Sequence, residues 1–469
     1  MFWNNGNHAS DPKVPAAVER YEQMLKNGSF TFLDAFEWED VIQYYMGCNN
    51  ARMALDATRR AVDQYPYSTN FLLTKAQLLA ANGRMRLALR ILSKVESIDP
   101  STAELFIIKG AIYSKLDEKG LARENFNKAI FHSDQLDMTY FDIAMECESL
   151  GNFTEAIRFL KKSYDANPTN PNILSELAFC YDVTDQVDES IRFHQALIDN
   201  NPYQELAWFN LAVAQCKKED YEGAYHSFEY ASLIRDNFWE AHFEMGEMLV
   251  ALNKRKEAIS AYEQSLMYFK SPRTLYCIGE CWEELEDYSK AARYYKRALR
   301  GDPAMADAWF GLGITSFQNR KETEAIQQMR KAIRLDEFNG EYWYMLGEVL
   351  KKTGDHEGAE EAYRTVIKLE PFTASAWVDL AELLIAQDRV DEGILTAIEG
   401  SKEHPDFSEI FYRISGYMLL HSQRKEGLRY LEDALALDYP GHQQFLQAFP
   451  ALKNDPHISY LIELYHPHS

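Results

Sequence analysis

The chain has 469 residues and 72 Asp or Glu against 49 Lys or Arg, which gives a formal net charge of −23 at pH 7. Such a surplus of acid repels a phosphate backbone, and the longest basic run, Lys254, Arg255 and Lys256, is too short to offset it. No stretch approaches the roughly 18 apolar residues that a membrane-spanning helix requires. The composition therefore predicts a protein that binds neither nucleic acid nor a membrane.

The first residues do not resemble a targeting signal. They lack the basic region followed by an apolar run that marks a signal peptide. Residues 1–15 are polar with two prolines, and we expect them to be disordered. Val18, Tyr21, Met24 and Leu25 then share one helical face, which predicts a short N-terminal capping helix within residues 16–34.

From residue 35 to residue 441 the sequence repeats itself at intervals of 34 residues. One column of the repeat contains only small residues: Ala54, Ala88, Ala122, Ala156, Ser190, Ala224, Ala258, Ala291, Ala325, Ala359, Gly393 and Gly427. A second column is large and mostly aromatic: Trp38, Leu72, Phe106, Tyr140, Leu174, Trp208, His242, Leu275, Trp309, Trp343, Trp377 and Phe411. A small residue stands four positions after most members of the aromatic column, and a proline often ends the unit.

These columns describe a helical hairpin. One unit contains the large residue Trp208, the apolar residue Leu211 and the small residue Ala212. Their spacing of three and four residues places them on one face of a helix. The small residue allows a neighbouring helix to approach closely. The alanine column marks the second helix, and the proline ends that helix and fixes the turn into the next unit.

The period and the order of these columns resemble the tetratricopeptide repeat. The resemblance covers residues 35–441, or about twelve units. It implies an all-α fold in which antiparallel helix pairs stack into a right-handed superhelical solenoid with a concave groove, and it implies that the chain works by binding other proteins.

The register slips once. The interval from Ala258 to Ala291 is 33 residues, and Leu275 is also one residue early. The missing residue therefore lies between 259 and 274. Ser271 and Pro272 are predicted to be the N-cap and first residue of the next helix, which implies a shortened turn and a local change of superhelical twist.

Residues 442–469 follow the array and are expected to form two capping helices, at 443–449 and 457–465, because a terminal repeat otherwise exposes an apolar face. Four histidines are crowded here: His442, His457, His466 and His468. They could bind a transition metal adventitiously, but we interpret them as solvated surface side chains.

Six scattered cysteines with no Cys-x-x-Cys pair indicate a reducing compartment, and we expect a cytoplasmic protein. Cys277 and Cys281 share a helical face, but no second pair of ligands matches them, so they are interpreted as core residues rather than metal ligands.

The segments outside the array are too short to build a catalytic domain. The sequence also lacks a phosphate-binding glycine loop, a His-Glu-x-x-His motif and a serine elbow. We therefore expect no enzymatic activity, no catalytic residue, no cofactor and no metal.

Some tetratricopeptide proteins clamp the C-terminal carboxylate of heat-shock chaperones with Lys, Asn and Arg from successive units. Asn210 matches the asparagine of that clamp. The preceding unit offers Ser175 and Phe179 where the clamp has Lys and Asn. The following unit offers Glu240 and Glu244 where the clamp has Lys and Arg. A carboxylate would be repelled there, so a chaperone-tail clamp is not expected.

Residues directly after the aromatic column are rotated about 100° from the packing stripe, toward the inner face. They are predicted to bind a partner with five rings: Phe209, Phe243, Tyr276, Phe310 and Tyr344. Nearby carboxylates would select basic side chains: Glu244, Glu247, Glu280, Glu283, Glu348 and Glu382. The alternative is that the rings pack against neighbouring helices and the glutamates are only solvated.

Two functions remain open. The first is a non-catalytic interaction scaffold or adaptor that holds a peptide or protein, such as a basic segment, in the concave groove. The second is an obligate structural subunit or assembly factor of a larger multiprotein complex, which large exposed apolar patches on the convex side would favour.

Overall fold

The computed structural model describes residues 16–27, 32–371 and 373–466, and in this part of the chain it contains 27 α-helices and no strand. Successive helices pair as antiparallel hairpins, twelve in all from α2 to α25, as the 34-residue repeat predicts. The expected disorder of residues 1–15, and His468, lie outside the described residues. The chain divides into two compact units, Met1–Ile234 (unit 1) and Arg235–Ser469 (unit 2).

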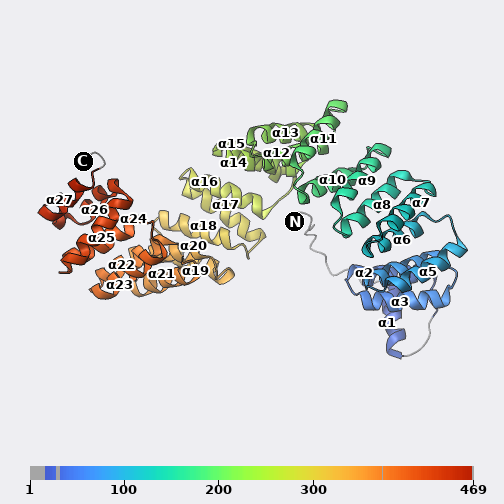
Figure 1. The fold of residues 1–469 in the computed structure, drawn as a ribbon, viewed down its shortest axis with the longest axis horizontal. Coiled ribbons are helices and arrows are strands. Elements are labelled where there is room, and N and C mark those ends of the chain that lie inside the picture. The colour runs from blue at the N-terminus through green and yellow to red at the C-terminus, as the bar shows by residue number, and fades with distance from the viewer. Residues whose placement is uncertain (1–15, 28–31, 372, 467–469) are drawn as a thin grey trace. The chain divides into compact units, whose positions relative to one another are not determined.

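Unit 1 contains an N-terminal helix and six hairpins, which are coloured blue to green in Figure 1. Its helices are α1 (Ala16–Asn27), α2 (Ala35–Gly47), α3 (Ala51–Gln64), α4 (Thr69–Ala81), α5 (Met85–Ile98), α6 (Ala103–Lys115), α7 (Lys119–Phe131), α8 (Leu136–Ser149), α9 (Phe153–Ala166), α10 (Pro171–Val183), α11 (Val187–Asn200), α12 (Glu205–Lys217) and α13 (Tyr221–Ile234). Helix α1 packs on the first hairpin through Tyr21, whose ring meets Trp38 edge-on with centroids 5.8 Å apart.

Unit 2 contains six further hairpins and a C-terminal cap. Its helices are α14 (Trp239–Ala251), α15 (Arg255–Tyr268), α16 (Pro272–Glu284), α17 (Tyr288–Gly301), α18 (Ala306–Gln318), α19 (Glu322–Leu335), α20 (Gly340–Thr353), α21 (His356–Leu369), α22 (Ala374–Ala386), α23 (Val390–Glu403), α24 (Ser408–Leu420), α25 (Arg424–Leu437), α26 (His442–Ala448) and α27 (Pro456–Leu464), with short 3₁₀ turns η1 (Tyr439–Gly441) and η2 (Pro450–Leu452). Phe445, Phe449 and Ile458 of the cap are buried against α24 and α25.

Each hairpin turns through one residue with a left-handed backbone. The nine that are not glycine are Asn49, Asp117, Asp185, Glu219, Asn253, Glu286, Arg320, Asp388 and Ser422, and Gly83, Gly151 and Gly354 complete the series. They recur every 34 residues, apart from the single 33-residue interval at the register slip. This conformation ends the first helix of the hairpin by satisfying its last carbonyls.

The alanine column is buried at the contact between the two helices of each hairpin, where Ala224 and Ala325, for example, are completely inaccessible. A larger residue four positions later in the second helix fills the space beside the small residue of the first helix. Tyr295 of α17 lies in this way against Gly279 of α16. The small column therefore makes room for a side chain as well as for a helix.

The aromatic column has a polar role that its sequence did not reveal. The indole N–H of Trp208 donates to the carbonyl of Pro202, six residues earlier, at 2.8 Å. The same bond is made by Trp309, Trp343 and Trp377. The Nε2 atom of His242 lies 3.2 Å from the corresponding carbonyl oxygen of Asp236. These four tryptophans thus tie the start of their helices to the link that precedes each one, and His242 keeps this contact.

The register slip is a short link between hairpins. Residues 269–271 join α15 to α16, three residues where the other hairpin-to-hairpin links have four. The Ser271 side chain accepts a hydrogen bond from the backbone N–H of Thr274, and Pro272 is the first residue of α16. This confirms the predicted cap. The expected change of twist across the link stays a prediction.

Candidate protein-binding surface

The first helices of the hairpins in unit 2 are strongly acidic at α14 and α16. These two helices carry six glutamates and a single basic residue, Arg273, apart from His242. We call the four half-buried or exposed residues Glu244, Glu247, Glu280 and Glu283 the acidic face. Four neighbouring carboxylates with one cation beside them produce a strong negative potential.

The five rings predicted to bind a partner lie deeper than the sequence suggested. Phe243 and Phe310 are only 9% and 8% exposed, while Tyr276 and Tyr344 are half-buried. Phe243 packs on Tyr262, Tyr276 on Tyr295, Phe310 on Tyr342 and Tyr344 on Tyr363, with centroids 4.6–6.0 Å apart. Phe243 and Phe310 therefore fit the alternative that the rings pack against neighbouring helices, whereas partner binding by the half-buried Tyr276 and Tyr344 stays a prediction. Each ring stands one residue after the aromatic column, and at this position it points toward a neighbouring helix and packs against a tyrosine there.

Phe209 belongs to unit 1 and has the same local environment. Its ring is half-buried and meets Phe228 of α13 at 5.1 Å. The next residue, Asn210, is buried, and its amide donates to the carbonyl of Leu174 at 3.0 Å. The asparagine at the position of the carboxylate clamp thus bonds to the backbone of unit 1 through its amide.

Tyrosines from the second helices hold several of the glutamates. The Tyr295 hydroxyl donates to Glu283 at 2.8 Å, and Tyr363 donates to Glu348 at 2.5 Å. Tyr262 makes the corresponding bond to Glu247. The tyrosines stand four residues after the alanine column, a position that the sequence reading did not connect with the glutamates. They fix carboxylates that would otherwise be mobile.

Two glutamates of the acidic face hold their protons unusually tightly. Burial raises the pKa of Glu244 to about 7, and Glu247 adds to the shift while Arg273 opposes it. Burial also raises the pKa of Glu280 to about 7, against the hydrogen bond that it accepts from Tyr276 at 2.8 Å. Arg273 thus favours the charged form of Glu244 in part, and neither carboxyl has an ion-pair partner within the described residues.

Further along the stack the acids are neutralised within the chain. Lys351 bonds to Glu382 at 3.0 Å and to Asp379 at 3.3 Å, and Arg413 reaches Glu382 at 3.4 Å. Glu382 is thus already paired. The first helices of unit 2 offer unneutralised charge at α14 and α16, and much less at α22.

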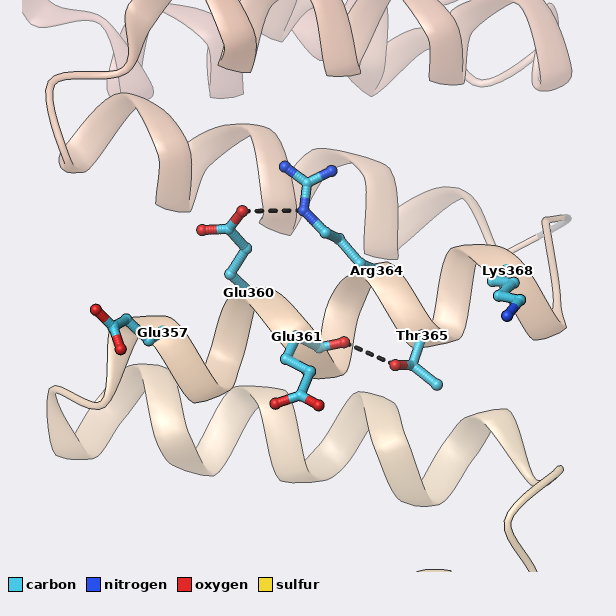
Figure 2. Close-up of a pocket in the computed structure, with 6 residues that line it drawn as sticks. All are labelled: Glu357, Glu360, Glu361, Arg364, Thr365 and Lys368. Carbon is cyan, nitrogen blue, oxygen red and sulfur yellow. Dashed lines mark hydrogen bonds and ion pairs between the residues drawn. The ribbon is translucent and has the colours of Figure 1, made fainter.

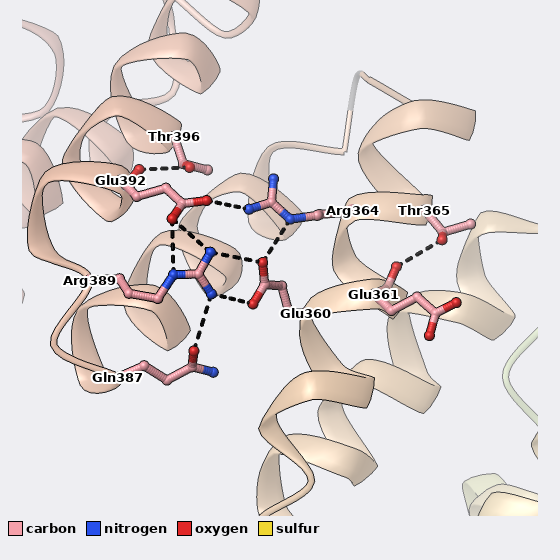
Figure 3. A network of polar contacts seen from close by, with 8 residues as sticks. All are labelled: Glu360, Glu361, Arg364, Thr365, Gln387, Arg389, Glu392 and Thr396. Carbon is pink, nitrogen blue, oxygen red and sulfur yellow. Dashed lines mark hydrogen bonds and ion pairs between the residues drawn. The ribbon is translucent and has the colours of Figure 1, made fainter.

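Other polar clusters in unit 2 are closed networks. Figure 3 shows Arg389, at the start of α23, bound to Glu360 and Glu392, while Arg364 of α21 bonds to the same two glutamates. Two cations and two anions balance, so the network fastens α21 to α23 and leaves no charge for a partner. Figure 2 shows the open depression along α21, which is lined by charged and polar side chains.

Within the described residues no group of His, Cys, Asp and Glu is arranged to hold a metal ion, and no helix has the length and apolar character needed to span a bilayer. Cys277 and Cys281 are buried free thiols. Burial raises the pKa of both thiols.

The stacked helical hairpins define a repeat protein of the all-α class. Residues 149–216, 283–340 and 344–406 match the sequence pattern of the tetratricopeptide repeat. These parts of the chain are tetratricopeptide repeats, as the sequence resemblance predicted.

Curated relatives match part of the chain. A tetratricopeptide-repeat-containing protein of Methanocaldococcus jannaschii is 24% identical over 256 residues, covering 49% of this chain and 44% of the relative. Anaphase-promoting complex subunit 3 of Schizosaccharomyces pombe is 23% identical over 239 residues, covering 50% of this chain and 36% of the relative. The match thus spans less than half of each relative's own length. Among solved structures, the Cut9 and Hcn1 hetero-tetramer of the APC/C aligns with 14% identity and a TM-score of 0.41, covering 86% of this chain and 93% of that chain.

Proposed function

We propose that this protein is a non-catalytic scaffold that binds a basic segment of a partner protein on the acidic face of α14 and α16. The observation that carries the proposal is that the carboxylates of Glu244, which is half-buried, and Glu280, which is exposed, have no ion-pair partner in the part of the chain that the structure describes. Within the described residues Glu244 makes no hydrogen bond or ion pair, and Glu280 is held only by a tyrosine hydroxyl. A partner's Lys or Arg supplies the missing countercharge.

The predicted rings contribute to this surface mainly by holding its charged side chains and its helices in place. Phe243 lies beneath the guanidinium of Arg273, which stands 5.3 Å from the ring centroid. Tyr276 positions Glu280 through its hydroxyl. The partly exposed edges of Tyr276 and Tyr344 are available to apolar side chains of a partner, while Phe310 and Phe243 hold the hairpins that present the acids. We accordingly centre the site on the glutamates.

A binding assay tests the proposal directly. The full chain is titrated against a short fluorescent peptide of Lys and Leu, and the dissociation constant is read from anisotropy. The variant Glu244→Gln with Glu280→Gln removes two charges while keeping the side-chain shapes, and we expect its Kd to rise about tenfold. The control Glu257→Gln with Glu322→Gln removes two exposed charges from second helices of the same unit and leaves Kd within about twofold. If wild type and the acidic-face variant bind the peptide with equal affinity, the proposal is wrong.

A second candidate is an obligate subunit of a larger assembly in the cytoplasm. One observation favours it: Met267, Tyr268 and Phe269, around the short link, are 70%, 46% and 48% exposed, which is a large apolar surface for one turn. One relative is named as a subunit of the anaphase-promoting complex. Purification of the tagged chain from cells followed by mass spectrometry distinguishes the two. A stoichiometric set of partners at every salt concentration favours the obligate subunit, and a salt-labile partner favours the scaffold.

A further inference from the structure

The exposed side of the second helices in unit 2 carries a stripe of positive charge in this otherwise acidic chain. Three successive second helices, α17, α19 and α21, have a cation at the same two positions of the repeat. The first position holds Lys296, Arg330 and Arg364, and the second holds Arg300, Arg334 and Lys368. Arg297 and Lys331 add to the stripe at the position between them. All are exposed except Lys331, which is half-buried.

The chain does not neutralise these charges. Within the described residues only Arg364 of the eight forms an ion pair, in the network with Glu360 and Glu392. We call the remaining seven residues the basic stripe: Lys296, Arg297, Arg300, Arg330, Lys331, Arg334 and Lys368. In Figure 2 Lys368 lies at the far end of α21, with no contact drawn to the other labelled residues. Seven positive charges without ion pairs repel one another. The chain leaves them unpaired although it has more Asp and Glu than Lys and Arg.

Helix-end electrostatics do not account for the stripe. Cations near the last turn of a helix interact favourably with its dipole, but several other second helices do without them. At the position of Arg300, α9, α11 and α13 have Asp165, Asp199 and Leu233. Lys402 of α23 continues the second position into the next hairpin, but Ile398 holds the first position there. Cations at both positions therefore occur together only in α17, α19 and α21.

The stripe is narrow and bordered by acids. On one side Glu263 of α15 accepts a hydrogen bond from Tyr294 of α17 at 2.8 Å, which places a carboxylate at its edge. The first turns of α19 and α21 expose Glu322, Glu324 and Glu357, and the second turn of α21 exposes Glu361. A nucleic acid would extend past the stripe into these acids and would gain too few phosphate contacts to offset them. A short acidic segment of a protein fits between the borders.

We propose that the basic stripe binds an acidic segment of a partner protein, at a surface separate from the acidic face. Carboxylates of the segment pair with Arg297, Arg300, Arg330 and Arg334, because guanidinium groups can bind carboxylates through two parallel hydrogen bonds. The lysines add charge without fixing geometry. One chain then holds two partners of opposite charge, or two regions of one partner. This inference does not depend on the proposed function of the acidic face.

The test uses the full chain and a fluorescent peptide of Glu and Ala. We expect saturable binding that weakens with added salt. The variant Arg297→Glu, Arg300→Glu and Arg334→Glu should lose at least about tenfold in affinity. The control Lys254→Glu, Lys256→Glu and Lys425→Glu makes the same change of net charge at exposed positions outside the stripe and should lose less than about threefold, the effect of long-range charge alone.

Each alternative has its own outcome. Equal losses in the two variants, or no binding by wild type, overturn the inference. A single-stranded DNA that binds the stripe more tightly than the peptide makes it a nucleic-acid surface and also overturns the inference. An unchanged far-UV circular dichroism spectrum and an unchanged midpoint of urea unfolding show that the stripe variant is folded, independently of the acidic face.

Discussion

Gly279 of α16 faces the ring of Tyr295 of α17 so closely that a Cβ atom on the glycine would stand 2.6 Å from Cε1 of the ring. Gly311 of α18, in the next hairpin, lies against the same ring, and a Cβ atom on this glycine would stand 2.6 Å from Cζ of Tyr295. The tyrosine hydroxyl then reaches Glu283. One ring therefore fixes the spacing of three helices and orients a carboxylate of the acidic face.

This relationship predicts a coupling between the two residues. Gly279→Ala should destabilise the chain by about 1–3 kcal/mol, because the ring cannot move away without disturbing α18. Tyr295→Leu introduces the residue that Leu92 and Leu160 supply at this position in other hairpins. In that background Gly279→Ala should cost less, with a coupling energy of about 1 kcal/mol or more in a double-mutant cycle. Additive losses in urea unfolding would show that the ring and the glycine do not constrain each other.

The hairpin turns predict opposite effects at two glycines of unit 1. Gly83 has a φ of 75°, Gly120 lies in α7 without a positive φ, and a Cβ atom would meet nothing within 4 Å at either. Gly83→Ala should lower the free energy of unfolding by about 1 kcal/mol, because alanine is strained in the left-handed region. Gly120→Ala should raise it by about 0.5–1 kcal/mol through lower entropy of the unfolded chain. Calorimetry of both variants measures the pair, and effects of the same sign would contradict the assignment of backbone strain.

The buried His194 predicts an acid-sensitive hairpin in unit 1. Its ring is inaccessible, Nδ1 lies 2.9 Å from the Ser190 carbonyl oxygen, and Nε2 has no hydrogen-bond partner within the described residues. Burial lowers the pKa of His194 to about 4. Between the unfolded pKa of about 6.5 and pH 4, the unfolded state binds a proton that the folded state refuses, so stability falls as pH falls, by about 3 kcal/mol in total.

Hydrogen exchange of the α10 and α11 amides measures this effect in the full chain. Glu148 and Glu176 nearby act in the opposite direction, because burial raises the pKa of both. The comparison with His194→Leu isolates the histidine. The difference in protection between wild type and variant should grow as pH falls from 7 to about 4.5. A constant difference over that range would mean that His194 is not the titrating group.

The acidic face predicts that binding of a basic peptide is linked to proton release. The pKa values of Glu244 and Glu280 are raised to about 7, so at pH 6 both are mainly protonated in the free protein. A bound cation favours the charged form and expels these protons. The affinity for the Lys and Leu peptide should therefore rise between pH 6 and pH 8. Calorimetry in two buffers of different ionisation enthalpy measures the protons released, and the Glu244→Gln, Glu280→Gln variant should release fewer.

The sequence predicted the hairpins because a 34-residue period leaves few other arrangements for its apolar columns. It also located the short link, because the repeat intervals that end at Leu275 and Ala291 are both one residue shorter than the others. The left-handed turn residues were not all predictable, because Glu219, Glu286 and Arg320 occupy positions that glycine or asparagine usually marks. In those hairpins the packing of the two helices outweighs the local preference.

The candidate site was predicted only in part. A residue's angle on a helix places Phe310 near the inner face, but whether its ring is exposed depends on Tyr342 in the next hairpin. The neutralisation of Glu382 likewise depends on Lys351 and Arg413 from other hairpins. The basic stripe was missed because its cations recur at helical spacing across three repeats and never form a long contiguous run.

Hydrogen exchange of the full chain with and without the Lys and Leu peptide tests the central proposal most directly. If the acidic face binds the peptide, protection should increase in α14 and α16 and remain unchanged in α17 and α19. The Glu244→Gln, Glu280→Gln variant should lose the added protection at the same peptide concentration. Protection that appears elsewhere in the chain, or that survives in the variant, would show that the basic segment binds at another surface and would contradict the account.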